Sequence, residues 1–479
     1  MAWLPLLHSF NGNPDGAHPN AGLVQGNGGN LYGAASQLGS LGFGTLYRIS
    51  LSGGYSVLYN FNNTTGAYPN VTLMEHTNGA FYGDTTQGGT GNVSPCSADA
   101  CGVFYTFKAS LSPFATLLPY AGTVGSKIGI LGQGFSASSV VKFNGVTATT
   151  VTRTGTTFLL ATVPAGASDG KVTVTTGATT LTSLQRFIVH NSWSSGAAIP
   201  KPVAFATATV LNNKIYVVGG YPGMTYSGPV GNNQIYNPAT NAWSAGASLP
   251  TGTAQAAAAA VKNILYVFGG TPDGATDSNA VWAYNPATNT WSPKAAMPTA
   301  RRSIAATVEN NIIYVVGGFS VSGGRLDTVE AYDPATNSWT EEAPLLVGKS
   351  EPAVGLVGTT IVSADGYNGS TDNGDNEGYN AATNKWTALK ADPKPRNAAC
   401  GGAIGSQIYI AGGGNTNGPA LTSTESFALS TNSWTALASV PQGTVAPGSA
   451  VYGGQLYCIG GWASSPDGVL LKNVQVYQP

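Results

Sequence analysis

Charged side chains are scarce in this chain of 479 residues. Asp, Glu, Lys and Arg make up 9% of the sequence and leave a formal net charge of −1. A protein that holds nucleic acid or an anionic membrane by electrostatics needs an excess of Lys and Arg, so neither partner is expected. The sequence also lacks a run of 18 apolar residues, which argues against a transmembrane helix.

Histidine and cysteine are rare as well. All four histidines lie in the first 190 residues, so residues 191–479 contain none. Catalysis by a Ser-His-Asp or Cys-His arrangement is therefore excluded from this C-terminal part. Of the four cysteines, Cys96 and Cys101 bracket a short loop with no second Cys/His pair at zinc spacing nearby. We expect them to form a local disulfide in an oxidising compartment.

Glycine, short apolar runs and turn residues are abundant instead, a profile typical of an all-β protein. One phrase recurs: YNPATNTW at 284–291, with variants at 236–243, 332–339, 379–386 and 427–434. Each Trp is followed 26 residues later by a glycine doublet or its equivalent, as Trp243 is by Gly269. Each unit contains a small-residue strand, a strand ending at the doublet, a strand ending in Tyr and a strand beginning with Trp. The sequence therefore predicts a four-stranded repeat of about 50 residues.

This pattern of VVGG or VFGG, then Tyr, then Trp seven residues later resembles the kelch repeat. Residues 190–479 are thus identified as a six-bladed kelch β-propeller, in which one unit has ADG, at Asp365, instead of the doublet. The last unit stops at Pro479, before its Trp. Its fourth strand must therefore come from NSWSSGAAIP at 191–200, which closes the ring and leaves no open sheet edge.

A second period runs through residues 1–114. GAHPNAGLVQGNGGNLYG (16–33) matches GAYPNVTLMEHTNGAFYG (66–83), FGTLYRI (43–49) matches CGVFYTF (101–107), and LHSF (7–10) echoes LYNF (58–61). These segments resemble the Gloeo/Verruco-type β-strand repeats of bacterial extracellular proteins. Two copies and a tail cannot close a ring. We expect a small open β-array, or a natural protein that extends further upstream.

Residues 115–189 do not show this repeat. Their sequence predicts strands of alternating apolar and polar residues, separated by turn signals. The GQGF motif at 132–135, Pro164 and Gly170 resemble those of an IPT/TIG domain, an immunoglobulin-like sandwich. Such domains usually serve as spacers or adhesion modules. The predicted order is therefore a β-repeat region, a sandwich and a propeller.

Superposing the propeller repeats reveals a candidate ligand site. Three successive units place a cation sixteen residues before the doublet, and four units place an aromatic residue two positions after its first glycine. Strand a begins and strand b ends on the same face, so these residues are expected to surround one mouth of the central channel, where aromatic and charged groups suit a sugar or an anion. The competing interpretation is that the cations belong to the repeat itself and the aromatics pack between blades. The predicted ligand-binding residues are Arg301, Arg302, Lys349, Arg396, Tyr221, Phe319, Tyr367 and Trp462.

Acidic residues concentrate in the fourth unit. A copper-radical oxidase, known among kelch propellers, is excluded because residues 191–479 offer no histidine ligand. Catalysis by a carboxylate pair remains open. The stretch DNGDNEG loosely resembles a calcium loop through Asp372, Asp375 and Glu377, although it lacks the twelve-residue spacing, and a solvated polar loop is the alternative. No other cofactor is expected.

A further disulfide is geometrically allowed in the propeller. Cys400 lies on strand a of one blade and Cys458 on strand b of the next, at similar heights.

Taken with the resemblances, these features predict a secreted bacterial, non-catalytic protein. It would present the propeller at a cell surface to bind carbohydrate or protein. One alternative is a carbohydrate-active enzyme of the sugar-acid epimerase or lyase type, with its site at the propeller mouth. Another is a structural surface or filament subunit that self-associates through the N-terminal repeats.

Overall fold

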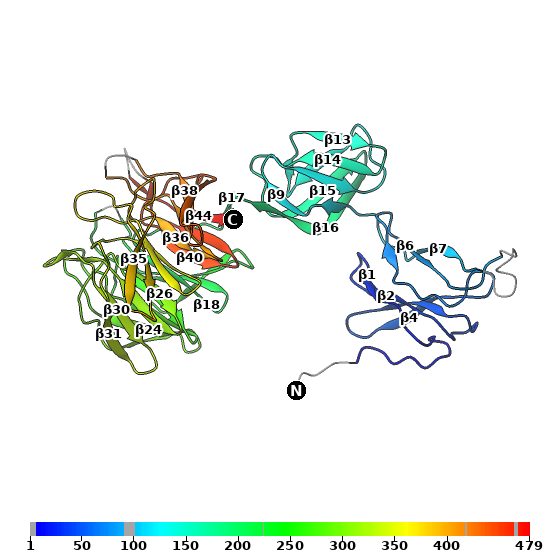
Figure 1. Ribbon diagram of the computed structural model, residues 1–479, viewed down its shortest axis with the longest axis horizontal. Coiled ribbons are helices and arrows are strands. Elements are labelled where there is room, and N and C mark those ends of the chain that lie inside the picture. The colour runs from blue at the N-terminus through cyan, green and yellow to red at the C-terminus, as the bar shows by residue number, and fades with distance from the viewer. Residues whose placement is uncertain (1–5, 91–100, 224, 417–418, 464–467) are drawn as a thin grey trace. The chain divides into compact units, whose positions relative to one another are not determined.

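The computed structural model describes residues 6–90, 101–223, 225–416, 419–463 and 468–479. Every regular element among them is a β-strand, which confirms the all-β prediction. No helix in these ranges is long and apolar enough to span a membrane. The chain divides into two compact units, Met1–His190 and Asn191–Pro479 (Figure 1).

The second unit contains six four-stranded sheets, as the repeat predicts. In each of the first five blades, four strands called a to d pair antiparallel in chain order. These strands are β18 (Thr207–Leu211), β19 (Lys214–Val218), β20 (Asn233–Asn237) and β21 (Ala242–Gly246); β22 (Ala257–Val261), β23 (Ile264–Phe268), β24 (Val281–Asn285) and β25 (Thr290–Pro293); β26 (Ala305–Glu309), β27 (Ile312–Val316), β30 (Val329–Asp333) and β31 (Ser338–Glu342); β32 (Ala353–Val357), β33 (Thr360–Ala364), β34 (Asn376–Asn380) and β35 (Lys385–Leu389); β36 (Cys400–Ile404), β37 (Gln407–Ala411), β38 (Thr424–Ala428) and β39 (Ser433–Leu437).

The sixth blade joins the two ends of the unit. Its strands are β40 (Gly448–Tyr452), β41 (Gln455–Ile459), β44 (Val474–Gln478) and, from the start of the unit, β17 (Ser192–Gly196). Trp193 lies opposite Tyr477 in the antiparallel register of β17 and β44. The predicted closure of the ring by the N-terminal strand is therefore confirmed.

The recurring Asn and Trp of the repeat form hydrogen bonds with the preceding blade. In blade 2, the side-chain carbonyl of Asn289 accepts hydrogen bonds from the Tyr284 hydroxyl and from the N–H of Ala247, both at 2.7 Å. The indole of Trp291 donates to the carbonyl of the same Ala247, also at 2.7 Å. Both backbone groups of one residue at the end of the previous outer strand are thus satisfied. We call this arrangement the inter-blade clamp.

The clamp recurs around the whole ring. At the closure, Asn191 and Trp193 hold Ala438 in the same way. The remaining clamps are Asn241 and Trp243 on Ala197, Asn337 and Trp339 on Ala295, Asn384 and Trp386 on Ala343, and Asn432 and Trp434 on Lys390.

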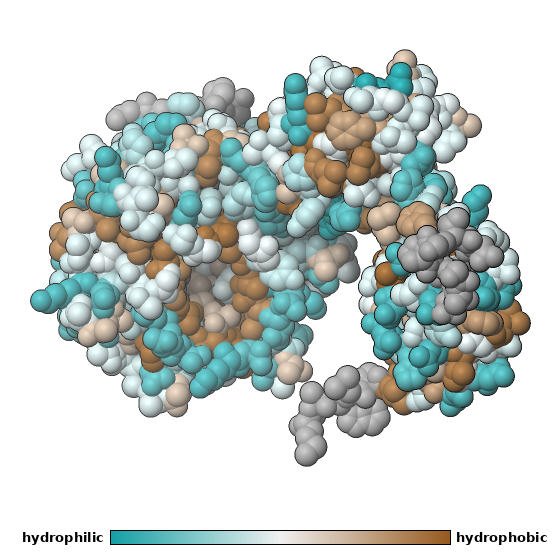
Figure 2. Space-filling view, turned by 45° about the vertical axis from the view of Figure 1, so that its right-hand side comes forward, coloured by the Kyte–Doolittle hydropathy of each residue, from teal (hydrophilic) through white to brown (hydrophobic). Residues whose placement is uncertain are grey.

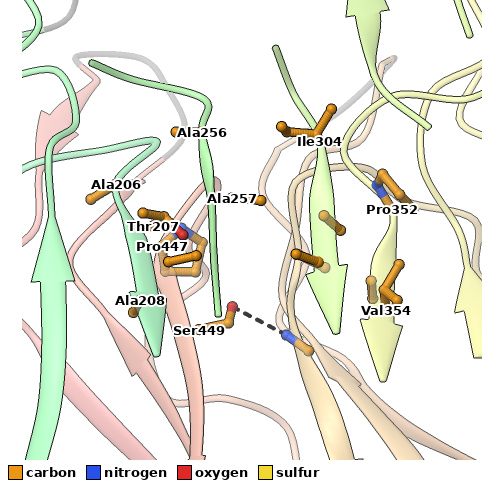
Figure 3. A pocket seen from close by; sticks show the side chains of 16 residues that line it. Ala206, Thr207, Ala208, Ala256, Ala257, Ile304, Pro352, Val354, Pro447 and Ser449 are labelled. Atoms are coloured by element: carbon orange, nitrogen blue, oxygen red, sulfur yellow. Dashed lines mark hydrogen bonds between the residues drawn. The ribbon is translucent and has the colours of Figure 1, made fainter. Parts of the chain in front are cut away.

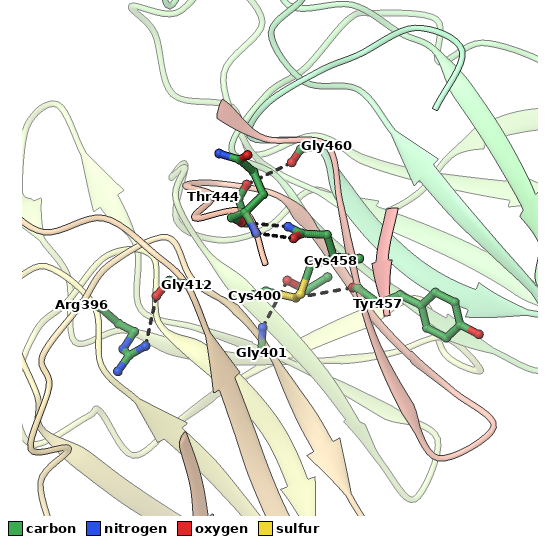
Figure 4. Close-up of a disulfide and its surroundings, with 11 residues drawn as sticks. Arg396, Cys400, Gly401, Gly412, Thr444, Tyr457, Cys458 and Gly460 are labelled. Carbon is green, nitrogen blue, oxygen red and sulfur yellow. Dashed lines mark hydrogen bonds between the residues drawn. A yellow bond between two sulfur atoms is a disulfide. The ribbon is translucent and has the colours of Figure 1, made fainter. Parts of the chain in front are cut away.

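A disulfide adds a covalent link between blades 5 and 6 (Figure 4). Cys400 on β36 and Cys458 on β41 are bonded with a Cα–Cα distance of 5.6 Å, and both side chains are buried. The pairing that the sequence allowed but left open is therefore present. The predicted Cys96–Cys101 bond involves Cys96, which lies outside the described residues.

The first unit contains a sandwich at residues 115–190. One sheet has the order β13 (Val151–Thr154), β14 (Phe158–Thr162), β10 (Lys127–Leu131), β8 (Thr116–Leu118). The other has the order β12 (Val146–Thr147), β11 (Val140–Phe143), β15 (Gly170–Thr176), β16 (Thr179–His190), β9 (Ala121–Thr123). A single apolar core that includes Ile130, Phe143 and Phe187 joins strands from both sheets. The predicted sandwich is present, and its IPT/TIG identity stays a prediction.

Two smaller sheets precede the sandwich. The first contains β1 (Val24–Gln25), β2 (Leu31–Ala35), β3 (Thr45–Ile49) and β4 (Tyr55–Asn60). The second contains β5 (Met74–Glu75), β6 (Ala80–Asp84) and β7 (Phe104–Lys108). The two sheets share one apolar core, which is described below.

The clamp leads to a prediction for Asn289→Ala. The substitution removes the acceptor of two hydrogen bonds and places alanine at a φ of +54°, so the propeller should lose roughly 1–3 kcal/mol of unfolding free energy. Tryptophan fluorescence during urea unfolding measures this, because eight of the nine Trp residues lie in 191–479. Thr288→Ala, in the same exposed turn, is the control and should change little. Equal effects of the two substitutions would contradict the clamp.

The disulfide leads to a second prediction. Replacing both Cys400 and Cys458 by Ala should lower the unfolding free energy by roughly 2–5 kcal/mol, because the bond closes a loop between residues 58 positions apart. The same fluorescence-monitored unfolding, repeated with a reductant, provides the measurement. Reduction should destabilise the parent propeller but not the double variant. An unchanged unfolding free energy in the variant would show that the bond contributes nothing.

Candidate functional site

The expected mouth exists as one face of the propeller. The third residue before each strand a forms a β-bridge with the residue after the glycine doublet or its equivalent, as Arg302 does with Phe319 and Val445 with Trp462. These bridges gather the loops between strands b and c on one face. Two of the loops form small hairpins, β28 (Phe319–Ser320) with β29 (Gly324–Arg325), and β42 (Trp462–Ala463) with β43 (Val469–Leu470).

A ring of left-handed backbone positions surrounds this mouth. One non-glycine residue per blade has a positive φ, between 45° and 58°, two positions after the site of the predicted cations. The N–H of Ser303 donates to the carbonyl of Gln255 (2.7 Å), and the N–H of Glu351 donates to that of Ser303 (2.8 Å). Similar bonds link most of the other neighbours. Sequence reasoning missed this ring because its members share no chemistry: Phe205, Gln255, Ser303, Glu351, Ala398 and Ala446.

Three of the predicted ligand-binding cations do not reach the mouth. Arg301, Lys349 and Arg396 are completely buried. Each is paired with a glutamate on strand c of its own blade: Arg301 with Glu330, Lys349 with Glu377 at 3.1 Å, and Arg396 with Glu425. Their assignment as ligand contacts is wrong, because a guanidinium or ammonium withdrawn from water is held by a buried carboxylate rather than offered to a ligand.

The sequence contained a signal for these pairs. A glutamate follows the cation by 28 or 29 residues in the three blades that have a cation. The other three blades have Val203, Thr253 and Thr444 at the cation position, and Gln234, Trp282 and Gln475 at the glutamate position. The residues thus change together, which indicates an internal pair. Burial lowers the pKa of Arg301, and Glu330 opposes that effect.

Two of the predicted aromatics are also structural. Tyr221 and Trp462 are buried and form a cluster with Phe205 and Tyr226, in which the ring centroids of Phe205 and Trp462 lie 5.4 Å apart. Phe319 and Tyr367 are only partly buried. Of the predicted aromatic surface, only Phe319 and Tyr367 remain accessible. Tyr226, which was not predicted, is a third accessible ring on this face.

Arginines and aromatics alternate beside one pocket of the mouth. The guanidinium of Arg325 lies over the ring of Phe319 at 4.5 Å and over that of Tyr367 at 4.8 Å. Arg302 lies over Phe319 at 5.0 Å and contacts Asp277 at 3.6 Å. The Nε of Arg325 is buried and has no hydrogen-bond partner among the described residues. The stack fixes both guanidinium groups and leaves Arg325 able to bind a further group.

The pocket, which we call the mouth pocket, has a volume of about 290 Å³. Its lining comes from the loops and ring positions of four blades: Tyr226, Gln255, Gly274, Arg302, Ser303, Phe319, Arg325, Ser350 and Glu351. Of the predicted site residues, the pocket contains Arg302 and Phe319, with Tyr367 stacked behind Arg325. Sequence reasoning missed Arg325, which lies in a loop that the repeat does not mark, and counted Glu351 only among the acidic residues of the fourth unit.

Glu351 is the one carboxylate that lines the mouth pocket. Its Oε1 accepts a hydrogen bond from the Ser303 hydroxyl at 3.2 Å. Burial raises the pKa of Glu351, Ser303 and Arg325 oppose this, and Asp372 adds to it. Its backbone has a φ of +58°, a conformation that is costly for a side chain other than glycine or asparagine. The carboxyl is thus held in a fixed place with a raised affinity for a proton.

The central channel below the mouth has little chemistry of its own. Its upper part has a volume of about 170 Å³ and is lined by small residues of the innermost strands, including Ala257, Thr207 and Ser449 (Figure 3). Figure 2 shows the propeller unit hollowed near its middle, with hydrophobic residues around the hollow. Among the described residues that line the channel, none is ionisable. Any proton transfer or ion pairing with a ligand must therefore take place at the mouth.

The calcium candidates are not brought together. Glu377 faces Lys349 inside the blade. Asp372 accepts hydrogen bonds from the side chain of Asn397 and from the N–H of Thr416. The backbone carbonyl of Asp375 accepts from Lys349 at 2.9 Å. Among the described residues, no group of three or more His, Cys, Asp or Glu side chains could hold a metal ion.

Blade 4 contains an unusual buried carboxylate at Asp365. The other five blades have glycine at this position with a φ between 58° and 74°, and Asp365 adopts the same conformation with a φ of +59°. Its carboxylate is buried, 3.6 Å from Nε of Arg396. Burial and the neighbouring Asp392 raise the pKa of Asp365 well above its ordinary value.

This carboxylate gives a pH-dependent prediction. Because the pKa of Asp365 is higher in the folded protein than in the unfolded chain, its contribution to stability is complete below about pH 3.8 and is lost as the pH rises through the folded value. Asp365→Asn should therefore be more stable than the parent at pH 7, with a gap that grows with pH by at most about 1.4 kcal/mol per unit.

Urea unfolding between pH 4 and pH 8 would measure this gap. The matched control is Asp333→Asn, because blades 1 and 2 have Asn237 and Asn285 at that exposed turn position. Hydrogen bonds from Ala335 and Thr336 lower the pKa of Asp333, so the difference in unfolding free energy between this control and the parent should stay constant above about pH 5 and change only toward pH 4. If Asp365→Asn lost stability at pH 7, the inferred proton on this carboxyl would be wrong.

Comparisons with known proteins agree with the two kinds of repeat. The kelch motif family model matches residues 202–250, 252–298, 300–346, 395–441 and 444–479. It leaves out blade 4, the blade with Asp365 in place of glycine. The Gloeobacter/Verrucomicrobia repeat matches residues 3–131. No curated protein matches the chain.

Among solved structures, the one titled "Structure of YjhT" resembles this chain with a TM-score of 0.52 and 20% sequence identity. The match covers 59% of this chain and 97% of the other. At this identity, the likeness concerns the fold. Together with the six closed blades, these findings show that the chain carries a kelch-repeat β-propeller preceded by Gloeobacter/Verrucomicrobia repeats.

Proposed function

We propose that the propeller binds a carbohydrate at the mouth pocket, and that the ligand carries a carboxylate. The observation that carries this proposal is the stack of Arg302, Phe319, Arg325 and Tyr367 beside the pocket. Aromatic rings pack against the apolar face of a sugar, and a guanidinium binds a carboxylate with two parallel hydrogen bonds. Arg302 is already paired with Asp277, so Arg325 is the group assigned to the ligand carboxylate.

The remaining pocket residues suit hydroxyl groups. A sugar hydroxyl both donates and accepts hydrogen bonds, and the pocket offers acceptors and donors in Glu351, Ser303 and Gln255. The volume of about 290 Å³ lies near the lower end of the range for ligand pockets, roughly 300–1,000 Å³. The pocket therefore suits a single sugar unit, such as the end of a longer chain, rather than an extended polymer.

The proposal includes a location outside the cytoplasm. The buried Cys400–Cys458 bond supports it, because structural disulfides are formed and kept in oxidising compartments. If the chain is secreted and its propeller binds sugars, the protein would act in adhesion or in recognition of cell surfaces.

A carbohydrate-active enzyme is the second candidate, and one residue favours it. Glu351 has a raised pKa and lies in the same pocket as two arginines. A carboxyl whose pKa is raised by burial is a candidate for proton transfer, which an epimerase or lyase acting on a sugar acid requires. The two candidates share the pocket and differ in whether Glu351 transfers a proton.

Binding of acidic and neutral monosaccharides, measured by calorimetry after a glycan-array screen, tests the proposal. Arg325→Met should weaken an acidic sugar by about 1.5–3 kcal/mol, roughly tenfold to more than a hundredfold, because it removes a charged hydrogen bond and keeps much of the stacked volume. Arg153→Met, an exposed position in the sandwich, is the matched control and should bind as the parent does. If Arg325→Met binds as tightly as the parent, the mouth pocket is not the site.

Glu351→Gln separates the two candidates. With an acidic sugar that binds, NMR can follow exchange of the anomeric form, epimerisation or elimination over time. An enzyme should convert the sugar and lose that conversion in the Gln variant while binding persists. With a binding protein, neither the parent nor the Gln variant should speed these reactions beyond the rate of the sugar alone.

A further inference from the structure

The two repeat sheets of the first unit stack on each other through complementary faces. We call β1–β4 repeat 1 and β5–β7 repeat 2. Each has a front face, with Leu23 and Leu31 in repeat 1 and Leu73 and Phe81 in repeat 2. The rear face has Tyr32 and Leu46 in repeat 1, and Tyr82 and Phe104 in repeat 2. The rear face of repeat 1 and the front face of repeat 2 lie in the same apolar core.

On each face, an apolar residue that is buried in one repeat has an exposed counterpart in the other. On the rear face, Leu46 of repeat 1 is 2% exposed, whereas its counterpart Phe104 in repeat 2 is 73% exposed. On the front face, Leu73 of repeat 2 is 4% exposed, whereas its counterpart Leu23 in repeat 1 is 50% exposed. The rear face of repeat 1 and the front face of repeat 2 therefore contact each other within the described chain. The rear face at Phe104 in repeat 2 and the front face at Leu23 in repeat 1 have no such contact there. Exposed apolar surface of this kind marks an interaction site.

The sheet edges show the same complementarity. In repeat 1 the outer edge of β3 is covered by β4, in a register that places Leu46 opposite Tyr59 and Tyr47 opposite Val57. In repeat 2 no strand of the described chain pairs with the outer edge of β7. The chain that follows β7 instead enters the sandwich, where β8 pairs with β10. An open edge offers unpaired N–H and C=O groups to another strand.

A spare strand of the required type precedes repeat 1. The segment LHSF at 7–10 corresponds to LYNF at 58–61, the end of β4 and Phe61. Residues Leu6–Phe10 belong to no sheet. Phe10 nevertheless packs on Tyr47 with a centroid distance of 5.2 Å, just as Phe61 packs on Tyr105 at 5.2 Å. The segment thus occupies the place on repeat 1 that the end of β4 occupies on repeat 2, and no described strand pairs with it.

We propose that copies of this chain associate head to tail through these repeats. The rear face of repeat 2 and the edge of β7 in one copy receive the front face of repeat 1 and the segment Leu6–Phe10 of a second copy. The internal register predicts that Phe104 lies opposite His8 and Tyr105 opposite Leu6. Because the two surfaces differ, each added copy presents a fresh rear face, so the assembly is open-ended. This inference does not depend on the mouth pocket.

Sedimentation velocity of the full chain over a wide concentration range tests the proposal. The mass should rise with concentration beyond that of a dimer. Phe104→Asp and Leu23→Asp should each weaken the association by at least about tenfold, because each places a charge in an apolar contact. Val321→Asp, at an exposed apolar position of the propeller, is the matched control and should associate as the parent does. Far-UV circular dichroism confirms that the variants are folded.

Mixing the two variants tests the head-to-tail geometry directly. Phe104→Asp retains a sound front face and Leu23→Asp retains a sound rear face, so an equimolar mixture should form a complex of one copy of each and no larger species. A two-fold symmetric interface would not recover in this way. Three results would overturn the proposal. The parent chain could stay monomeric at all concentrations, both variants could associate as tightly as the parent, or the mixture of the two variants could stay monomeric.

Discussion

The propeller depends on the inter-blade clamp, in which the Asn and Trp of each blade form hydrogen bonds with one residue of the blade before it. A four-stranded sheet cannot bury both of its faces alone, so a ring of such sheets is stable only if neighbours are held in fixed register. The clamp provides this register by using a single residue, such as Ala247, as both donor and acceptor. The Asn turn is left-handed, which places its side-chain carbonyl toward the neighbour and also turns the chain into strand d. The recurring Tyr-to-Trp motif in the sequence therefore reflects contacts between blades as well as the Tyr–Asn hydrogen bond and the Tyr–Trp packing within each blade.

The inner side of the ring follows a different rule. Six innermost strands surround one axis, so their side chains must be small, and β22 is almost entirely alanine. The long polar side chains of the inner region turn instead into the blades, where Arg301, Lys349 and Arg396 meet their glutamates. Chemistry that could act on a ligand is thereby displaced from the channel to the loops of the mouth.

What could be predicted from the sequence was the register of the backbone, and what could not be predicted was the direction and meeting of individual side chains. The blade number and the closing strand followed from spacing, because spacing reflects backbone register. For Cys400 and Cys458, spacing gave similar heights in adjacent blades and left the pairing open. The buried cations were misassigned because a repeat position gives the height of a side chain along the axis but not the direction in which it points. Arg325 was missed because it lies in a loop between strands b and c, and these loops differ in length from blade to blade. Glu351, one of the acidic residues of the fourth unit, was not assigned to the mouth because its meeting with that loop depends on three-dimensional packing. Asp365 was visible as a departure from the repeat, and its meaning emerged only from its place beside Arg396 and Asp392.

The closing strand also determines how the propeller would respond to a pulling force. Only Asn191 separates β16 of the sandwich from β17, so tension along the chain enters the ring at its seam. The strand β17 is held by its pairing with β44 and by the clamp on Ala438, all non-covalent contacts. Beyond the seam, β41 is joined covalently to blade 5 through Cys458. Once β17 is peeled away, the load passes to β18 of blade 1, whereas blade 6 stays covalently joined to blade 5, so the ring would open between blades 6 and 1.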